Sequence, residues 1–71
     1  MNARQLIEIL KQIPPETPIF IKGYEGGLDD AKKTSMEVVS LNVHTESYLG
    51  DHDYYDNCYK GKEKVNGLLI Q

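Results

Sequence analysis

The feature that most constrains this chain is the abrupt change from an apolar run to a glycine-rich, acidic segment between residues 19 and 30. Residues 19–21 are three consecutive strand formers, and both faces of such a strand must be covered. Pro18 suits the first position of a strand because it has no N–H to donate. The glycines at positions 23, 26 and 27 then allow a sharp turn. We therefore expect a strand over residues 18–22, central in its sheet or at an interface.

The turn that follows this strand is acidic, because it carries Glu25, Asp29 and Asp30. A phosphate-binding loop is excluded, since no Lys-Ser/Thr pair follows the glycines and the carboxylates would repel phosphate. Two interpretations stay open for these three acids. They are either solvated turn residues or part of a contact surface for a cation or a basic partner.

Size, charge and cysteine content limit the class of protein. With 71 residues the chain is expected to form a single small domain, residues 1–71, with a marginal core. One cysteine, Cys58, excludes an internal disulfide and favours a cytoplasmic location. The net charge of −3 argues against nucleic-acid binding. No segment resembles a signal peptide or a membrane span, so we expect no membrane association.

Hydrophobic periodicity predicts one helix and two further strands. Apolar residues at helical spacing indicate a helix over residues 3–12, with Asn2 and Gln5 forming a capping box at its start. Residues 36–44 alternate as a half-buried strand does, and residues 64–71 form the last strand. The sequence therefore predicts an α+β fold with one N-terminal helix packed on a three-stranded antiparallel sheet, in the order αβββ.

One helix covers only one face of such a sheet, and the other face keeps its apolar side chains. An uncovered apolar patch on a small protein usually marks an interaction surface. We therefore expect a homodimer whose subunits meet through this face. The residues expected on the dimer face are Phe20, Val38, Leu68 and Ile70.

The segment from residue 45 to 63 is a long polar loop that is rich in tyrosine and aspartate. Loops of this length are usually functional or disordered, and tyrosines recur at recognition surfaces. Together with the first acidic turn this loop could form one negative end of the domain. We expect a non-enzymatic protein–protein interaction module, whose partner is contacted by this acidic, tyrosine-bearing end, by the apolar sheet face or by both. The expected partner-binding residues are Glu25, Asp29, Asp30, Tyr48, Asp51, Asp53, Tyr54, Tyr55 and Asp56. We expect no catalytic residue, metal or cofactor in this interpretation.

The alternative is a small metal-binding protein or enzyme that uses His44, His52, Cys58 and nearby acids. A calcium-binding EF-hand is excluded, because Asp56 stands where glycine is required and Lys62 where the bidentate glutamate is required. Histidine, cysteine and carboxylates are possible transition-metal ligands or a thiol nucleophile with its base. Their mutual distances are not given by the sequence, so this alternative stays open.

Three segments of the chain resemble a group of small uncharacterised bacterial and phage proteins. They are the opening pattern L-I-x-x-L followed by Pro14-Pro15, the block G-Y-E-G-G-x-D-D at residues 23–30, and L-N-V-H-T at residues 41–45 followed by Tyr48 and Gly50. The resemblance implies a bacterial or mobile-element origin and a cytoplasmic site of action. Inhibition of a host or defence component is the subtype that it suggests.

Overall fold

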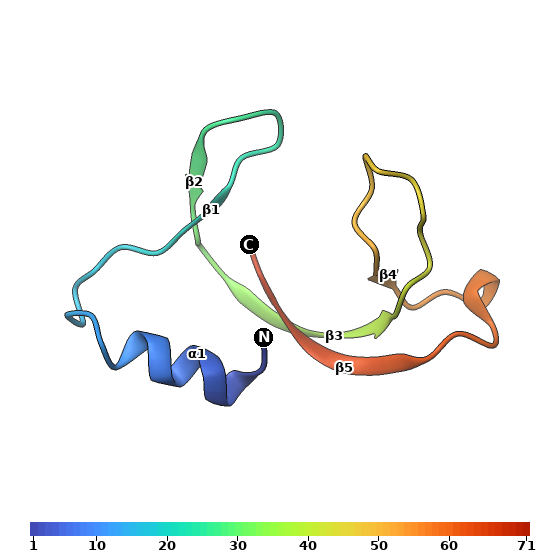
Figure 1. Ribbon diagram of the computed structural model, residues 1–71, viewed down its shortest axis with the longest axis horizontal. Helices are drawn as coiled ribbons and strands as arrows, with labels where there is room; N and C mark the ends of the chain where they lie inside the picture. Colours follow the sequence, from blue (N-terminus) through green and yellow to red (C-terminus); the bar gives the residue numbers. More distant parts are fainter. The chain divides into compact units, whose positions relative to one another are not determined.

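The computed structural model describes the whole chain from Met1 to Gln71. Its elements are α1 (Ala3–Leu10), β1 (Phe20–Lys22), β2 (Leu28–Asp30), β3 (Thr34–Ser40), β4 (Asp53–Tyr54), the 3₁₀ helix η1 (Asn57–Tyr59) and β5 (Lys64–Ile70) (Figure 1). A helix and antiparallel strands together confirm the α+β class. The chain divides into two compact units, Met1–Ala31 and Lys32–Gln71. No helix is both long and apolar enough to cross a bilayer.

Helix α1 begins with the capping box that the sequence predicts. The Oδ1 atom of Asn2 accepts the Gln5 backbone N–H at 2.9 Å, and the Asn2 N–H donates to Oε1 of Gln5 at 2.8 Å. These two bonds satisfy donors that the first turn of a helix leaves free. The helix ends at Leu10, two residues before the predicted end, because the next residues continue as turns that lead to Pro14.

Strands β1 and β2 form a two-stranded hairpin, which corrects the predicted sheet. Phe20 lies opposite Asp30, so the strand predicted over residues 18–22 pairs with β2 and not with β3 or β5. The Gly23 N–H donates to the Gly27 carbonyl at 3.1 Å and closes the hairpin. A Cβ atom on Gly23 would collide with the Gly26 carbonyl oxygen, so this tight turn requires glycine there.

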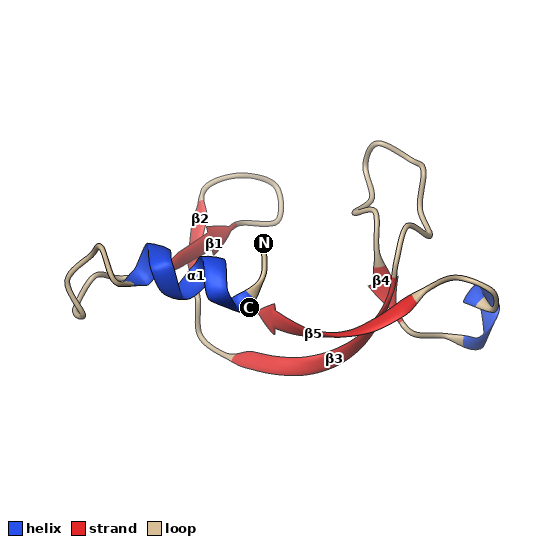
Figure 2. Ribbon diagram, turned by 60° about the horizontal axis from the view of Figure 1, so that its bottom comes forward, coloured by secondary structure: helices blue, strands red, loops and turns tan.

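The second unit contains a three-stranded antiparallel sheet in the order β4-β3-β5. Strands β3 and β5 pair along their full length, from Thr34 opposite Ile70 to Ser40 opposite Lys64 (Figure 2). The strand predicted over residues 36–44 ends at Ser40, because Asn42 adopts a left-handed backbone conformation with φ of 55°. A three-stranded sheet is thus present, but the short β4 supplies the third strand.

The β3–β5 register defines one face of this sheet. Residues opposite each other in an antiparallel pair point to the same side, so Met36, Val38, Leu68 and Ile70 share a face. Met36 is 67% exposed and Leu68 is 54% exposed. Three of the four expected dimer-face residues therefore lie together, whereas Phe20 belongs to the separate β1–β2 hairpin. Packing of α1 on a sheet stays a prediction, because the helix and this sheet belong to different units.

Candidate partner-binding site

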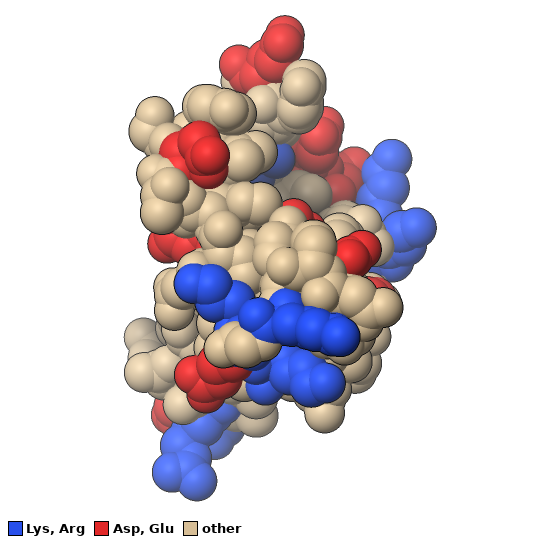
Figure 3. Space-filling view, turned by 90° about the vertical axis from the view of Figure 1, so that its right-hand side faces the viewer, with Lys and Arg blue, Asp and Glu red and all other residues tan.

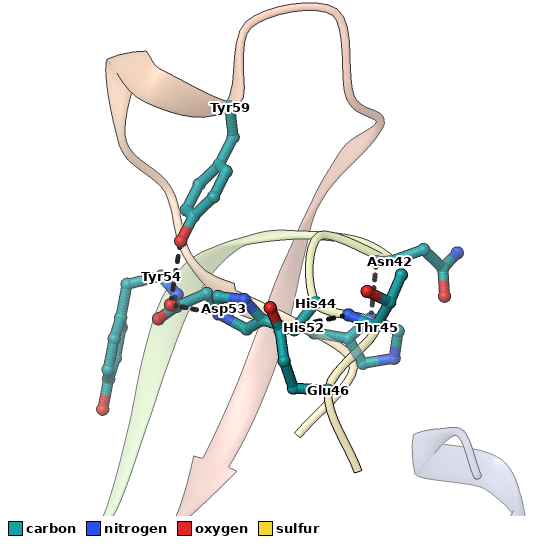
Figure 4. Close-up of polar contacts among 8 residues, drawn as sticks. All are labelled: Asn42, His44, Thr45, Glu46, His52, Asp53, Tyr54 and Tyr59. Carbon is teal, nitrogen blue, oxygen red and sulfur yellow. Dashed lines mark hydrogen bonds and ion pairs between the residues drawn. The ribbon is translucent and has the colours of Figure 1, made fainter. Parts of the chain in front are cut away.

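The chain between β3 and β4 is a closed loop within the second unit. The N–H groups of Val43 and His44 both donate to the Asp51 carbonyl oxygen, at 2.8 and 3.2 Å. The Asn42 N–H donates to the Nδ1 atom of His52 at 3.0 Å (Figure 4). Because Nδ1 accepts this bond, the neutral His52 ring carries its proton on Nε2. These contacts close the loop immediately before β4 begins.

Asp53 is the centre of a polar cluster at the start of β4. Its Oδ2 atom lies 2.8 Å from Nε2 of His44 and accepts the Tyr59 hydroxyl at 3.1 Å, while Oδ1 accepts the Tyr54 N–H at 2.8 Å (Figure 4). The His44 bond, followed by the Tyr54 and Tyr59 bonds, holds the pKa of Asp53 below its ordinary value of 3.8. Asp53 is therefore a carboxylate at neutral pH, and Nε2 of His44 must carry the donated hydrogen.

The same cluster holds Tyr59 in place from two directions. Its ring meets the His44 ring edge-on, with the ring centroids 6.0 Å apart. Loss of hydration and the neighbouring Asp53 raise the pKa of the Tyr59 hydroxyl above its ordinary value of 10.0. Tyr59 thus remains a hydrogen-bond donor at neutral pH, and it links the segment after β4 to the start of β4 and to His44 in the loop before it.

The segment that follows β4 is held by local contacts. The Tyr55 N–H donates to the Val38 carbonyl at 2.9 Å and continues the pairing of β4 with β3. Oδ1 of Asp56 accepts the Cys58 N–H at 3.0 Å and caps η1, which lowers the pKa of Asp56. The Lys64 ammonium lies 4.5 Å from the centroid of the Tyr55 ring, a cation–π contact.

An open hollow of about 210 Å³ lies on the sheet beside this cluster. Its lining comes from β3, β4, β5 and the residue before β4, and consists of Glu37, Val39, His52, Asp53, Tyr54 and Leu69. Val39 and Leu69 give it an apolar floor. The Glu37 carboxylate makes no hydrogen bond or ion pair within the chain. Gly67 lies opposite Glu37 in the ladder, so no side chain fills the neighbouring position.

The expected partner-binding residues divide into three groups. Tyr48, Tyr54 and Tyr55 are exposed, Tyr48 at 83%, and are free to contact another molecule. Asp53 and Asp56 are engaged in the hydrogen bonds described above, whereas the exposed side chain of Asp51 makes none. The acids of the first turn are exposed in the other unit; they are Glu25, Asp29 and Asp30. Figure 3 shows a face on which acidic and basic side chains are both exposed.

The structure does not assemble the residues of the alternative interpretation. His44 is paired with Asp53, His52 accepts from the Asn42 backbone, and the Cys58 backbone is bound to Asp56. No three His, Cys, Asp or Glu side chains lie together in an arrangement that would hold a metal ion. The Cys58 thiol, the nucleophile of this alternative, makes no hydrogen bond to His44 or Asp53, so the geometry does not favour this alternative.

Sequence reasoning missed Glu37 and Leu69 as members of a site. The alternation in residues 36–44 does place Glu37 and Val39 on one face, and that signal was available. What was missing was the register, which puts Leu69 of β5 and Tyr54 of β4 on the same face of the sheet as Glu37 and Val39.

Comparison with known proteins gives no relative from which a function can be transferred. No protein-family model, no curated protein and no solved structure matches this chain. The resemblance to small bacterial and phage proteins stays an expectation.

Proposed function

We propose that this chain is a non-enzymatic protein-binding module whose partner inserts a lysine or arginine side chain into the hollow beside Glu37. The observation that carries the proposal is the combination of an unpaired carboxylate with an apolar floor in one depression of the sheet. Lysine and arginine have this dual character, since an apolar stem ends in a charged head.

The apolar floor suits the stem of such a side chain. Val39 and Leu69 lie on the same face of the sheet, on either side of the Glu37–Gly67 pair, and provide aliphatic surface. Glu37 supplies the charge for the head group. A charge-assisted hydrogen bond to a carboxylate contributes about 1.5–3 kcal/mol when both groups are shielded from water.

Tyr54 provides exposed contact area at the hollow. Tyr54 lines it and is 56% exposed, and Tyr48 and Tyr55 are exposed in the same unit. Tyrosine contributes a large, rigid and partly polar surface at low entropic cost, which is why it is enriched in interfaces. The Asp53 cluster supports this surface by fixing the segment that carries Tyr54 and Tyr55.

The partner class follows from this chemistry. A segment with an exposed lysine or arginine between apolar residues fits the hollow, and the unpaired Asp51 carboxylate adds negative charge to the same unit. Inhibition of a host or defence protein is the biological form of this activity that the resemblance to phage proteins suggests.

The proposal is tested with a pair of charge-matched variants. Glu37→Gln removes the charge in the hollow, and Glu63→Gln removes one at an exposed position outside it. Proteins captured from a bacterial lysate by the wild type are identified, and their affinities for the three chains are measured. We expect Glu37→Gln to bind roughly tenfold more weakly or worse, and Glu63→Gln to bind as the wild type does.

A direct probe separates the hollow from the rest of the surface. A short alanine peptide with one lysine is titrated into ¹⁵N-labelled protein, and the same peptide with norleucine in place of lysine is the control. We expect only the lysine peptide to shift the amide signals of Glu37, Val39 and Leu69. Equal shifts from both peptides, or unchanged partner binding by Glu37→Gln, would refute the proposal.

A further inference from the structure

Strand β5 has a free edge along its whole length. In the order β4-β3-β5 it pairs only with β3, through a continuous register of seven residue pairs from Lys64–Ser40 to Ile70–Thr34. A free edge of this kind presents unpaired N–H and C=O groups to its surroundings. The question is which groups these are, and what the edge would pair with.

The hydrogen bonds at the two ends of the ladder show which groups are free. Beyond one end, Lys33 and Gln71 exchange both backbone bonds, at 2.7 and 2.9 Å, and beyond the other end the Leu41 N–H donates to the Glu63 carbonyl at 2.8 Å. Hydrogen-bonded pairs alternate with non-hydrogen-bonded pairs along an antiparallel ladder. In β5, residues 65, 67 and 69 therefore face β3, and the backbone groups of residues 66, 68 and 70 face the open edge.

This edge lacks the features by which proteins usually block strand pairing. Residues 65–70 contain no proline and no charge, and the unbroken register contains no bulge. The only charged residue of the strand is Lys64, at one end. Exposed edges without such features favour pairing with another strand.

We propose that β5 pairs with β5 of a second copy of this chain, antiparallel about a two-fold axis at Leu68, so that two three-stranded sheets become one six-stranded sheet. Leu68 then exchanges backbone hydrogen bonds with Leu68 of the second copy, and Asn66 does so with Ile70 of that copy. An identical strand is always complementary to itself in such an arrangement, because a two-fold axis maps the pairing onto itself.

The exposed side chains favour a second copy as the occupant of the edge. Met36, Leu68 and Ile70 are 67%, 54% and 36% exposed on one face of the sheet. A two-fold axis at Leu68 places Leu68 of the second copy beside Leu68, so that the row from Met36 to Leu68 continues into the same row of the second copy. An unrelated peptide would pair with the backbone of the edge but would supply this apolar surface only by chance.

The test uses a proline at a position whose N–H points outward, so that no hydrogen bond of the β3–β5 ladder is deleted. Asn66→Pro deletes a donor on the free edge, while Asn66→Ala keeps the donor and removes the same side chain. We expect the wild type and Asn66→Ala to sediment as concentration-dependent dimers and Asn66→Pro to sediment as a monomer. Cross-strand contacts between Val39 and Val65, measured by nuclear Overhauser effects, report whether the β3–β5 ladder is retained.

Amide hydrogen exchange in the unaltered protein provides a second test that does not depend on the proline variant folding. The Leu68 N–H lies on the free edge and the Leu69 N–H faces β3. We expect the protection of Leu68 to increase with protein concentration and that of Leu69 to be present throughout. A wild-type monomer at millimolar concentration, an Asn66→Pro dimer, or Leu68 protection that is independent of concentration would each overturn the proposal. All these readouts are independent of the hollow at Glu37.

Discussion

The Nε2 atom of His44 lies 2.8 Å from the Oδ2 atom of Asp53, although nine residues separate them in the chain. This pair links the loop that follows β3 to the first residue of β4. The hydroxyl of Tyr59 donates to the same Asp53 oxygen at 3.1 Å, so one carboxylate holds three parts of the second unit together. These contacts thus hold the acidic, tyrosine-rich segment in one conformation.

The Asp53 carboxylate is expected to make the second unit sensitive to acid. Because hydrogen bonds lower the pKa of Asp53 in the folded chain, its contribution to stability is present above the ordinary value of 3.8 and is lost as the pH falls through the lower, folded-state value. We expect the temperature of the unfolding midpoint to decrease as the pH is lowered below about 4. In Asp53→Asn we expect this decrease to be less steep. Thermal unfolding followed by circular dichroism between pH 2 and 7 measures both chains. Identical pH profiles for the two would contradict the role assigned to Asp53.

The capping box at the start of α1 gives a prediction for the first unit. Asn2→Ala removes the acceptor of the Gln5 N–H and is expected to destabilise the helix by about 1 kcal/mol. Asn2→Asp keeps an acceptor and is the matched control. The ¹³Cα chemical shifts of residues 3–10 measure helix content in each chain. An Asn2→Ala helix with unchanged shifts would show that the cap contributes nothing.

Local patterns predict the elements of this fold better than their pairing. The capping box of α1 and the strands at β3 and β5 follow from spacing and alternation, and the structure confirms them. The partner of β1 was predicted wrongly, because the tight turn after Gly23 brings the next residues back as β2. Asp29 and Asp30 have low strand propensity, so pairing alone makes them a strand.

Local sequence patterns could not predict the candidate site either, for a related reason. Strand β4 is only two residues long, Asp53 and Tyr54, and the sequence placed both in a loop. Its register against Val39 and Ser40 is what brings Tyr54 to the hollow. Neither the nine-residue separation of the His44–Asp53 pair nor the hollow beside it corresponds to a local motif.

The left-handed backbone at Asn42 predicts a difference between two small substitutions. Asn42 has φ of 55°, a conformation that costs most residues with a Cβ atom about 1 kcal/mol, asparagine less and glycine little. We expect Asn42→Ala to destabilise the second unit by about this amount, whereas Asn42→Gly changes its stability by less. Both variants keep the N–H that donates to His52, so urea unfolding of the two compares their backbone contributions, in which the greater freedom of glycine in the unfolded chain offsets part of the strain that it relieves. A glycine variant less stable than the alanine variant would contradict this account.

The Cys58 thiol is expected to react slowly although the residue is exposed. Loss of hydration, followed by the Asp56 carboxylate, raises the pKa of the thiol above its ordinary value of 9.0. Because the thiolate is the reactive form, a raised pKa leaves less of it at neutral pH. We expect iodoacetamide to modify Cys58 more slowly in the folded chain than in urea at the same pH, and the rate in the folded chain to go on rising with pH beyond 9.0.

The Asp56→Asn variant separates the two causes of this raised pKa. Asparagine keeps a side-chain oxygen that accepts the Cys58 N–H, so η1 stays capped while the negative charge is removed. We expect its alkylation rate to lie between those of the folded and unfolded wild-type chains, because the larger effect of lost hydration remains. Mass spectrometry at timed intervals gives the rates. An Asp56→Asn variant that reacts no faster than the folded wild type would show that the Asp56 charge does not act on the thiol. Equal rates for the folded and the unfolded wild type would contradict a raised pKa of Cys58.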